Sequence, residues 1–436
     1  MRLNRPLPVD EGRPAPTPTP ARVRGRLGPA LQESLRRIFI NRNYAIFMVG
    51  AFVSATGSWG QAVALSWLVL ELGNSEFLLG LTNFAAMVPL LVLSIPAGAI
   101  VDRFNHKTLL LTAQTGTMAA NAILAVATIA GVRSIPLILI CALAGGLFNA
   151  IGWPLWSVFI NDLVGPEHLR SAVALNSVRF NLTRVVGPAI AGVLLARFGT
   201  GMCLAISALS ALGVIFAIAA IRVPPSKPKL ALPWLSSVRE GLAFCWNDKA
   251  ALRLLLLTSV VGLTIMPYQT FLSAFVRDVL GRGPEALGIL LTSVGVGAIG
   301  GAVISGSGYT ARRHESALVT LMLMCGVSLA TFSFTRSMSL SMTVLAAVGL
   351  SSVAYLAMAN ATLQLACPQE LLGRVMGVWT VVNAGMQPVG SLAIGALAEG
   401  VGLTTSLLAV GVLCALVALL AGLPRARRRR LRAASA

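Results

Sequence analysis

Long apolar runs recur along the chain and are separated by short polar connectors. Each run is about 20 residues or longer, which is enough for a helix to cross the ~30 Å hydrocarbon core of a bilayer. In lipid a helix satisfies its backbone hydrogen bonds internally, so the pattern predicts an all-α membrane protein. We expect twelve spans, at residues 44–70, 77–101, 108–131, 135–160, 171–196, 201–221, 251–275, 286–308, 316–335, 339–365, 375–398 and 402–423.

Composition supports this interpretation. Of the 436 residues, 56% are hydrophobic and only 11% are charged, with a mean hydropathy of +0.81. A soluble protein of this length would need far more charge to cover its surface. The composition therefore excludes an ordinary soluble enzyme, a disordered chain and a secreted disulfide scaffold.

The charge is strongly basic, at +19, which by itself points to nucleic acid. Its distribution points elsewhere. With both tails placed on one side of the membrane, 27 of the 34 Lys and Arg residues fall on that side, five fall opposite, and Arg179 and Arg184 lie inside a span. This asymmetry predicts cytoplasmic termini in a bacterial inner (plasma) membrane, and no nucleic-acid partner.

Polar segments divide the chain into five parts. Residues 1–43 are rich in Pro and Arg and predict a disordered basic cytoplasmic tail. Residues 44–221 and 251–423 each hold six spans. Between them, residues 222–250 form the longest connector, where apolar residues at helical spacing predict an amphipathic helix on the membrane surface. Residues 424–436 form a second basic tail.

The two halves carry matching glycines. Gly80 and Gly98 flank the second span as Gly288 and Gly306 flank the eighth, at an offset of 208 residues. The pair Gly187 and Gly192 matches Gly390 and Gly395 at an offset of 203. Such a repeat predicts two homologous six-helix bundles in parallel orientation, a known plan for transporters with a substrate site between the halves.

The connector after the second span reads GAIVDRFNHK. This resembles the loop signature of the major facilitator superfamily, here carried by Gly98, Asp102, Arg103 and Lys107. The resemblance implies a gating motif at the cytoplasmic ends of the helices. The second half lacks these charges, since Thr310, Ala311 and Glu315 stand at the matching positions.

Segments over nearly the whole chain resemble the drug and siderophore efflux branch, which includes the enterobactin exporter and macrolide efflux proteins. SATGSWGQAVALSWLVLEL and NDLVGPEHLRSAVALNS are two of them. Gly187, Pro188 and Gly192 resemble part of the antiporter signature, in which Pro can bend the fifth span and Gly allows close packing. Val193 stands where the full signature has another Gly.

Ionisable groups inside a membrane are functional candidates by default. Arg179 and Arg184 lie in the fifth span, and Arg184 directly precedes the Gly-Pro segment. They could bind an anionic or carbonyl-rich substrate, or serve as structural hydrogen-bond donors. Further cavity candidates are polar groups, for which interhelical hydrogen bonding is an equal alternative: Gln61, Asn83, Asn149, Asn176, Asn181, Tyr268, Gln269, Asn360, Gln364, Asn383 and Gln387.

The sequence predicts no metal site and no cofactor. Its six Cys residues form no CxxC pair, and its three His residues lie apart in connectors. No P-loop occurs, so we do not expect an ATP-driven pump, and the resemblance implies that the proton motive force drives transport. The acidic residues Glu71, Asp102, Asp162 and Glu399 lie at span ends rather than mid-membrane, so proton coupling is implied by the resemblance alone.

These features predict a monomeric twelve-helix secondary active transporter that exports a small drug-like or siderophore-like molecule by alternating access. A lysophospholipid or other lipid transporter of the same superfamily is the first alternative. A polytopic membrane enzyme is a remote alternative, because no paired carboxylates or histidines mark the helix ends.

Overall fold

The computed structural model describes residues 42–221, 234–306 and 314–434. Its secondary structure in these ranges is helical. The helices of the first half are α2 (Arg42–Gly73), α3 (Glu76–Arg103), α4 (His106–Ile129) and α5 (Ile135–Ala220). They are followed by α6 (Trp234–Asn247), α7 (Lys249–Thr264), α8 (Tyr268–Ala274), the π-helix η1 (Phe275–Val279), α9 (Pro284–Gly306), α10 (His314–Ser333), α11 (Met338–Ala366), α12 (Leu372–Val401) and α13 (Leu403–Ala434).

Eleven helices of the described ranges are long and apolar enough to cross a membrane. Two glycines with positive φ divide the long α5. Gly165, with a φ of 72°, ends the helix Ile135–Gly165, and Gly199, with a φ of 74°, lies within the next helix, Glu167–Ala220. Positive φ at these glycines reverses the chain without the steric penalty that other residues incur. The long α5 is therefore three spans, and the described ranges hold twelve, as predicted.

Local sequence explains where several helices begin. The Ser75 side chain accepts a hydrogen bond from the Leu78 amide at the start of α3, and Asn105 accepts one from Thr108 at the start of α4. Asp248 caps α7 in the same way. Each cap satisfies a backbone amide that has no partner within its helix.

The start of the first span and the end of the last span differ from the predicted boundaries. The first helix starts at Arg42, so residues 42 and 43 belong to it rather than to the tail. At the other end α13 continues as a helix to Ala434, through the segment predicted as a basic tail. Arg, Ala and Leu are strong helix formers, so the helix continues where the membrane-spanning part ends. Residues 1–41 lie outside the described ranges.

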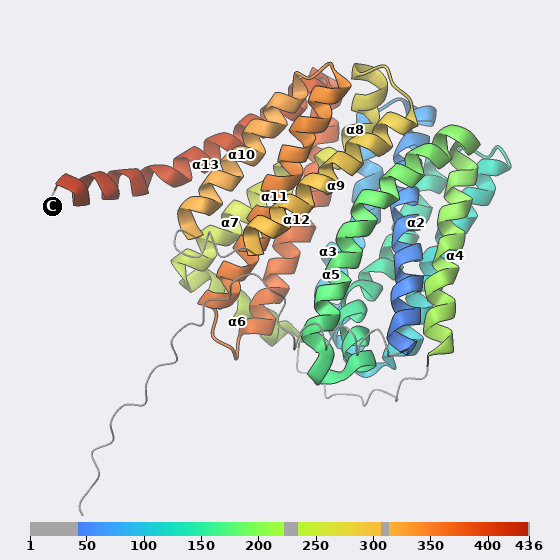
Figure 1. Ribbon diagram of the computed structural model, residues 1–436, viewed down its shortest axis with the longest axis horizontal. Coiled ribbons are helices and arrows are strands. Elements are labelled where there is room, and N and C mark those ends of the chain that lie inside the picture. Colours follow the sequence, from blue (N-terminus) through green and yellow to red (C-terminus); the bar gives the residue numbers. More distant parts are fainter. Residues whose placement is uncertain (1–41, 222–233, 307–313, 435–436) are drawn as a thin grey trace, which may run out of the picture.

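The helices form two bundles, with α2 to α5 in one and α7 to α13 in the other (Figure 1). We call the side that holds the start of α2, the connector helix α6 and Gly422 of α13 the tail side, and the opposite side the far side. In Figure 1 the bundles meet at the top, on the far side, and diverge toward the bottom.

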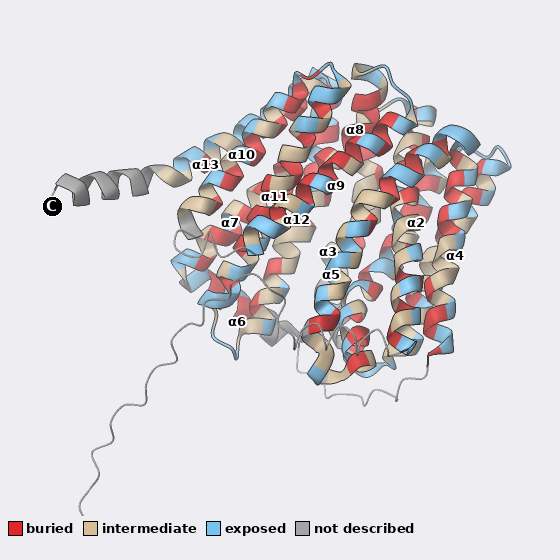
Figure 2. Cartoon of the chain, viewed as in Figure 1, coloured by how far each residue is buried: buried red, intermediate tan, exposed pale blue. Residues whose placement is uncertain are grey.

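Buried residues (red in Figure 2) lie in both bundles, and the apolar ones form two clusters. One apolar cluster crosses both halves toward the far side, and joins Leu79 and Leu195 of the first half to Leu287 and Ile394 of the second. Another lies wholly in the first half toward the tail side, around Tyr44, Phe47, Leu155, Phe159 and Val214. The halves therefore share a core only toward the far side in the described part of the chain.

The repeated glycines line the contacts between the halves. A Cβ added to Gly80 of α3 would lie 2.4 Å from the Ser391 carbonyl oxygen of α12, and one added to Gly288 of α9 would lie 2.6 Å from the Pro188 carbonyl oxygen of α5. Ser391 and Pro188 are themselves 203 residues apart, the offset of the repeat. The two contacts are thus related by the internal symmetry, and we call them the glycine seams.

Hydrogen bonds between the halves accompany the seams. Asn83 donates to Ser391 Oγ over 2.8 Å, and Ser75 donates to Glu399 near the end of α12. Arg277 donates to the Leu70 carbonyl oxygen over 2.9 Å. Within the described ranges, the hydrogen bonds that join the two bundles lie at mid-depth or toward the far side.

Candidate functional site

Arg179 is fully engaged within the first half. Its guanidinium donates to Asn176 Oδ1 over 3.1 and 2.9 Å and to the Ala51 carbonyl oxygen over 3.0 Å, and lies 5.6 Å from the centre of the Trp156 ring. The Tyr44 hydroxyl is close enough to interact with it electrostatically. These contacts join α2 to the middle of α5, so the geometry gives Arg179 a structural role and occupies Asn176 with it.

Arg184, five residues further on, has a different environment. It is half-buried near the middle of the helix that runs from Gly165 to Gly199. Its side chain makes no hydrogen bond to any described residue. A Cβ on Gly295 of α9 would lie 2.8 Å from the Arg184 carbonyl oxygen, and Thr292 donates to the Val185 carbonyl oxygen over 3.0 Å. Arg184 therefore lies where α5 meets the second half.

Tyr268 of the second half lies within electrostatic range of Arg184. It begins α8, only 1% of its surface is exposed, and its hydroxyl interacts electrostatically with Arg184. The hydroxyl forms no hydrogen bond with the described part of the chain, and the Gln269 side chain lies close to it. Pro267 interrupts the seventh span before α8, which sets Tyr268 at the break.

Several predicted cavity amides instead join helices. Gln61 and Asn121 exchange reciprocal hydrogen bonds between α2 and α4, one of them 2.6 Å long. Asn83 bonds Ser391 across the seam, and Gln364 donates to Asn360 over 2.5 Å within α11. For these residues the geometry favours the interhelical or intrahelical alternative.

The other predicted amides differ in whether they form a hydrogen bond and in how exposed they are. Asn181 donates to the Ser177 carbonyl oxygen one turn before it, over 2.8 Å. Asn149 is exposed, while Asn383 and Gln387 are half-buried on α12. These last three form no hydrogen bond within the described ranges, so they and Gln269 are left as polar groups that a cargo could contact.

The loop motif positions the tail-side ends of the helices. Lys107 Nζ donates to the Ala219 and Ile221 carbonyl oxygens over 2.9 and 2.7 Å, at the C-terminal end of α5. A cation there satisfies free carbonyls and complements the helix dipole. Arg103 is exposed. The surroundings of Gly98 and of the Asp102 side chain fall outside the described part of the structure.

A neighbouring ion pair escaped the sequence analysis. His106 Nδ1 lies 2.6 Å from Asp162 Oδ2, which ties the start of α4 to the tail-side end of the fourth span. The two residues are 56 positions apart, so no helical spacing could reveal the pair. Only the knowledge that both lie at tail-side helix ends would have suggested it.

Gly187 and Gly192 act at two different contacts. A Cβ on Gly187 would lie 2.8 Å from Trp59 Cβ of α2, within the first half, whereas one on Gly192 would lie 3.0 Å from Gly288 Cα of α9. Pro188 lies between them and supplies the carbonyl that Gly288 approaches. The segment that resembles the antiporter signature thus forms one glycine seam.

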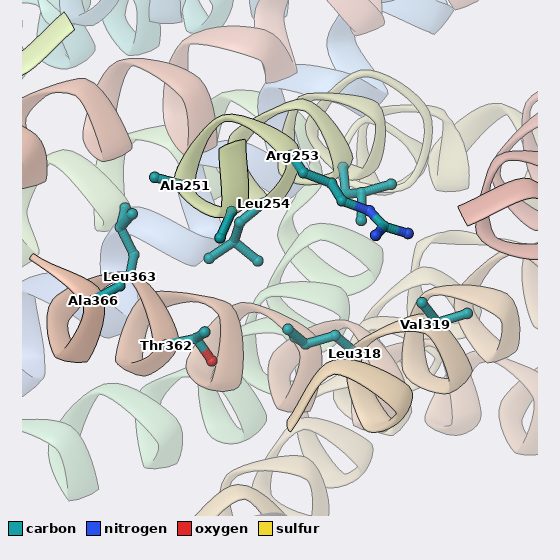
Figure 3. Close-up of a pocket in the computed structure, with 10 residues that line it drawn as sticks. Ala251, Arg253, Leu254, Leu318, Val319, Thr362, Leu363 and Ala366 are labelled. Carbon is teal, nitrogen blue, oxygen red and sulfur yellow. The ribbon is translucent and has the colours of Figure 1, made fainter. Parts of the chain in front are cut away.

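A separate pocket lies inside the second half near the tail side (Figure 3). Its empty volume is about 520 Å³, including the solvent at its mouth, and it is lined by α7, α10 and α11 residues such as Leu254, Leu318 and Leu363. Arg253 at its edge donates to the Ala421 carbonyl oxygen of α13. The lining is apolar and distant from the contact between the halves.

Comparisons with known proteins agree with this architecture. The chain belongs to the major facilitator superfamily, because the model of its transmembrane secretion effector family matches residues 38–435. The chain is thus a multi-pass membrane transporter and not an enzyme.

Individual relatives are transporters as well. The multidrug efflux pump Tap of Mycolicibacterium fortuitum is 27% identical over 397 residues, covering 88% of this chain and 96% of that relative. The staphyloferrin A transporter of Staphylococcus aureus is 29% identical over 266 residues, covering 58% of this chain and 64% of that relative. The crystal structure of the nucleoside transporter NupG shares the fold, with a TM-score of 0.69 at 11% identity over 87% of this chain and 98% of that one.

Proposed function

We propose that this transporter exports a small organic molecule, drug-like or siderophore-like, by alternating access. The functions of two relatives, multidrug efflux and staphyloferrin A transport, support the cargo class. The observation that carries the proposal is the pair of glycine seams, which close the far side around a mid-membrane junction that holds Arg184. The structure then represents the state that receives cargo from the tail side.

The direction of export follows from the proposed orientation. Positive residues concentrate on the cytoplasmic side of membrane proteins, and 27 of the 34 Lys and Arg residues fall on the tail side. With the tails in the cytoplasm, the far-side seams face outward. Cargo would bind from the cytoplasm and leave after the seams part.

The seams suit a rocking motion. Glycine lets backbones approach closely, so each seam is a contact between rigid helices rather than an interlocked set of long side chains. Within the described ranges the hydrogen bonds beside the seams are few, such as Ser75 to Glu399 and Asn83 to Ser391, so they can break and reform as the halves tilt. The energy source in this proposal is the proton motive force, since the sequence carries no ATP-binding P-loop.

Efflux from cells tests the proposal. A strain without its own efflux pumps would express the full chain and be loaded with ethidium, carboxyfluorescein or a fluorescent lysophospholipid. We expect one of the two dyes to leave faster than from cells with the Gly395→Val variant, whose added side chain would meet the Glu76 carbonyl oxygen. An uncoupler should abolish the difference.

Two results would overturn the proposal. If none of the three compounds leaves faster than from the Gly395→Val cells, the chain is not such an exporter. If only the lysophospholipid moves, the lipid alternative is correct. The matched control is Gly400→Val in the same helix, where an added Cβ meets nothing within 4 Å.

A further inference from the structure

The charges of the complete sequence leave Arg184 without a counter-charge. The acidic residues of the described ranges lie in α6, in η1, in connectors or within the first or last turns of the spans. Arg184 lies near the middle of its span, so no carboxylate of the described residues lies at its depth. A cation held in a membrane interior without an anion or hydrogen-bond acceptor is costly, and such groups mark binding sites or ion pathways.

Arg179 shows how the same helix satisfies an arginine that has a structural role. It has an amide oxygen, a backbone carbonyl oxygen and an aromatic ring around it. Arg184 has no such set among the described residues. The two side chains are the same chemically and five positions apart, so the difference lies in what the fold places around them.

The Tyr268 hydroxyl is the second observation. It is buried without a hydrogen-bond partner in the described ranges, although a buried phenol normally has one, and it lies within electrostatic range of Arg184. An arginine carries only donors, and the phenol can donate as well. Two donors without partners, one on each side of the contact between the halves, fit an acceptor with negative charge, and a carboxylate takes both types of hydrogen bond.

The two groups come from different halves. Arg184 belongs to α5, and Tyr268 begins α8 of the second bundle. An anion bound between them would bridge the bundles at the level where Gly295 and Thr292 pack on α5. Binding would then act directly on the contact between α5 and the second half, which must change during transport.

We propose that Arg184 and Tyr268 form a binding site for the carboxylate of an organic anion, and that organic anions are the cargo class of this transporter. The cargo assignment rests on the export function proposed above, whereas the binding site does not. Gln269, beside the phenol, supplies an amide that can contact a polar group next to the carboxylate.

Binding to the purified full-length protein tests the site, with carboxyfluorescein as the probe. We expect carboxyfluorescein to raise the melting temperature of the parent protein, and Arg184→Gln to weaken this binding by about tenfold or more. Tyr268→Phe, which removes only the hydroxyl, should weaken it by roughly threefold to tenfold. Arg184→Lys keeps the charge and should retain part of the affinity.

The empty protein gives a second readout that is independent of any ligand. Removal of a charge that has no partner inside the membrane should raise the melting temperature of Arg184→Gln above that of the parent. The matched variant Arg179→Gln loses its hydrogen bonds and should melt lower, with its carboxyfluorescein affinity unchanged. A structural Arg184 would instead make both variants melt lower.

Each outcome decides the proposal. The site is overturned if carboxyfluorescein does not stabilise the parent, or if Arg184→Gln binds it as tightly as the parent does. If phosphatidylglycerol stabilises the parent through Arg184 and carboxyfluorescein does not, the anion is a lipid headgroup and the cargo assignment is wrong. If the dye binds through Arg184 but cells export nothing, the site stands and the export function fails.

Discussion

In the described ranges, Lys and Arg side chains donate to backbone carbonyls more often than to carboxylates. Arg179 reaches the Ala51 carbonyl oxygen, Lys107 reaches two carbonyls at the end of α5, and Arg277 reaches that of Leu70. A chain with only 15 acidic residues against 34 basic ones has few carboxylates to offer. Helix ends and carbonyls therefore replace them as partners.

Lys107 allows a test of this at one residue. Lys107→Met keeps most of the aliphatic stem but removes the donor that holds Ala219 and Ile221, so we expect a loss of about 1 kcal/mol in the free energy of unfolding. Thermal unfolding of the purified protein measures it. Arg103→Met, at an exposed position of the same motif, is the control and should change little. Equal shifts in both variants would show that the capping contact contributes nothing.

At the scale of helices, the repeat explains the packing. Gly187 approaches Trp59 of the first span in its half, and its equivalent Gly390 approaches Leu263 of the first span in the other. Gly192 and Gly395 each meet the second span of the opposite half. One glycine of each pair thus builds a bundle, and the other builds the contact between bundles.

This division predicts that far-side closure depends on Gly395. Gly395→Val would place a side chain against the Glu76 carbonyl oxygen and Phe77 Cα, so the seam should open. The measurement is maleimide labelling of a single cysteine introduced by Ser391→Cys, a position with 0% exposure. We expect labelling to rise about tenfold, which corresponds to a shift of 1.4 kcal/mol in the open–closed equilibrium. No rise, or an equal rise with Gly400→Val, would contradict the role of the seam.

The connector helix α6 is also held by a glycine contact. A Cβ on Gly241 would lie 2.8 Å from the Arg374 carbonyl oxygen of α12, and Arg374 also forms an ion pair with Glu240. The pair is solvent-exposed, so it should contribute less than the close packing. This contact attaches α6 to the second half and buries Cys245, which is only 3% exposed.

Cys245 reports whether α6 is docked. Burial raises the pKa of its thiol, and Cys367 and Asp248 raise it further. A raised pKa lowers the thiolate fraction at neutral pH, so labelling should be slow at pH 7 and accelerate as pH rises. Gly241→Val should undock α6, return the pKa toward its usual value and speed labelling at pH 7 by about tenfold.

Two variants complete that experiment, each with Cys245 as the single remaining cysteine. Gly373→Val adds a side chain next to Arg374 where nothing lies within 4 Å, and should leave the labelling rate unchanged. Arg374→Ala should raise it only slightly, because it removes the exposed ion pair alone. If Gly241→Val also leaves the rate unchanged, α6 does not depend on this contact.

At the scale of the whole molecule, the apolar runs and the repeat predicted the fold, but the sequence did not predict which polar side chains contact each other. Apolar runs and the glycine repeat are properties of the chain itself, so they predicted the twelve spans and the matching glycines of the two halves. Which polar groups meet depends on helices brought together from distant segments, as with Gln61 and Asn121 or Asn83 and Ser391. For the same reason the sequence did not show that Arg179 has hydrogen-bond partners and Arg184 has none among the described residues.

The charge distribution also bears on the energy source. If the cargo is an organic anion and no acidic residue lies at mid-membrane depth, each cycle moves net negative charge outward. An inside-negative potential would drive this by about 2.3 kcal/mol per charge for each 100 mV, which sustains roughly a fiftyfold concentration ratio. The electrical part of the proton motive force would then suffice.

Proteoliposomes that contain the full chain separate the two parts of that force. We expect carboxyfluorescein to leave loaded vesicles faster when a potassium gradient with valinomycin makes the interior negative, at equal pH on both sides. Vesicles with Arg184→Gln should lose this response, while those with Arg179→Gln keep it. A response to a pH gradient alone, with no effect of the potential, would show that protons carried by another group drive the cycle. Ethidium moving under the same potential would show that the protein does not select negative charge.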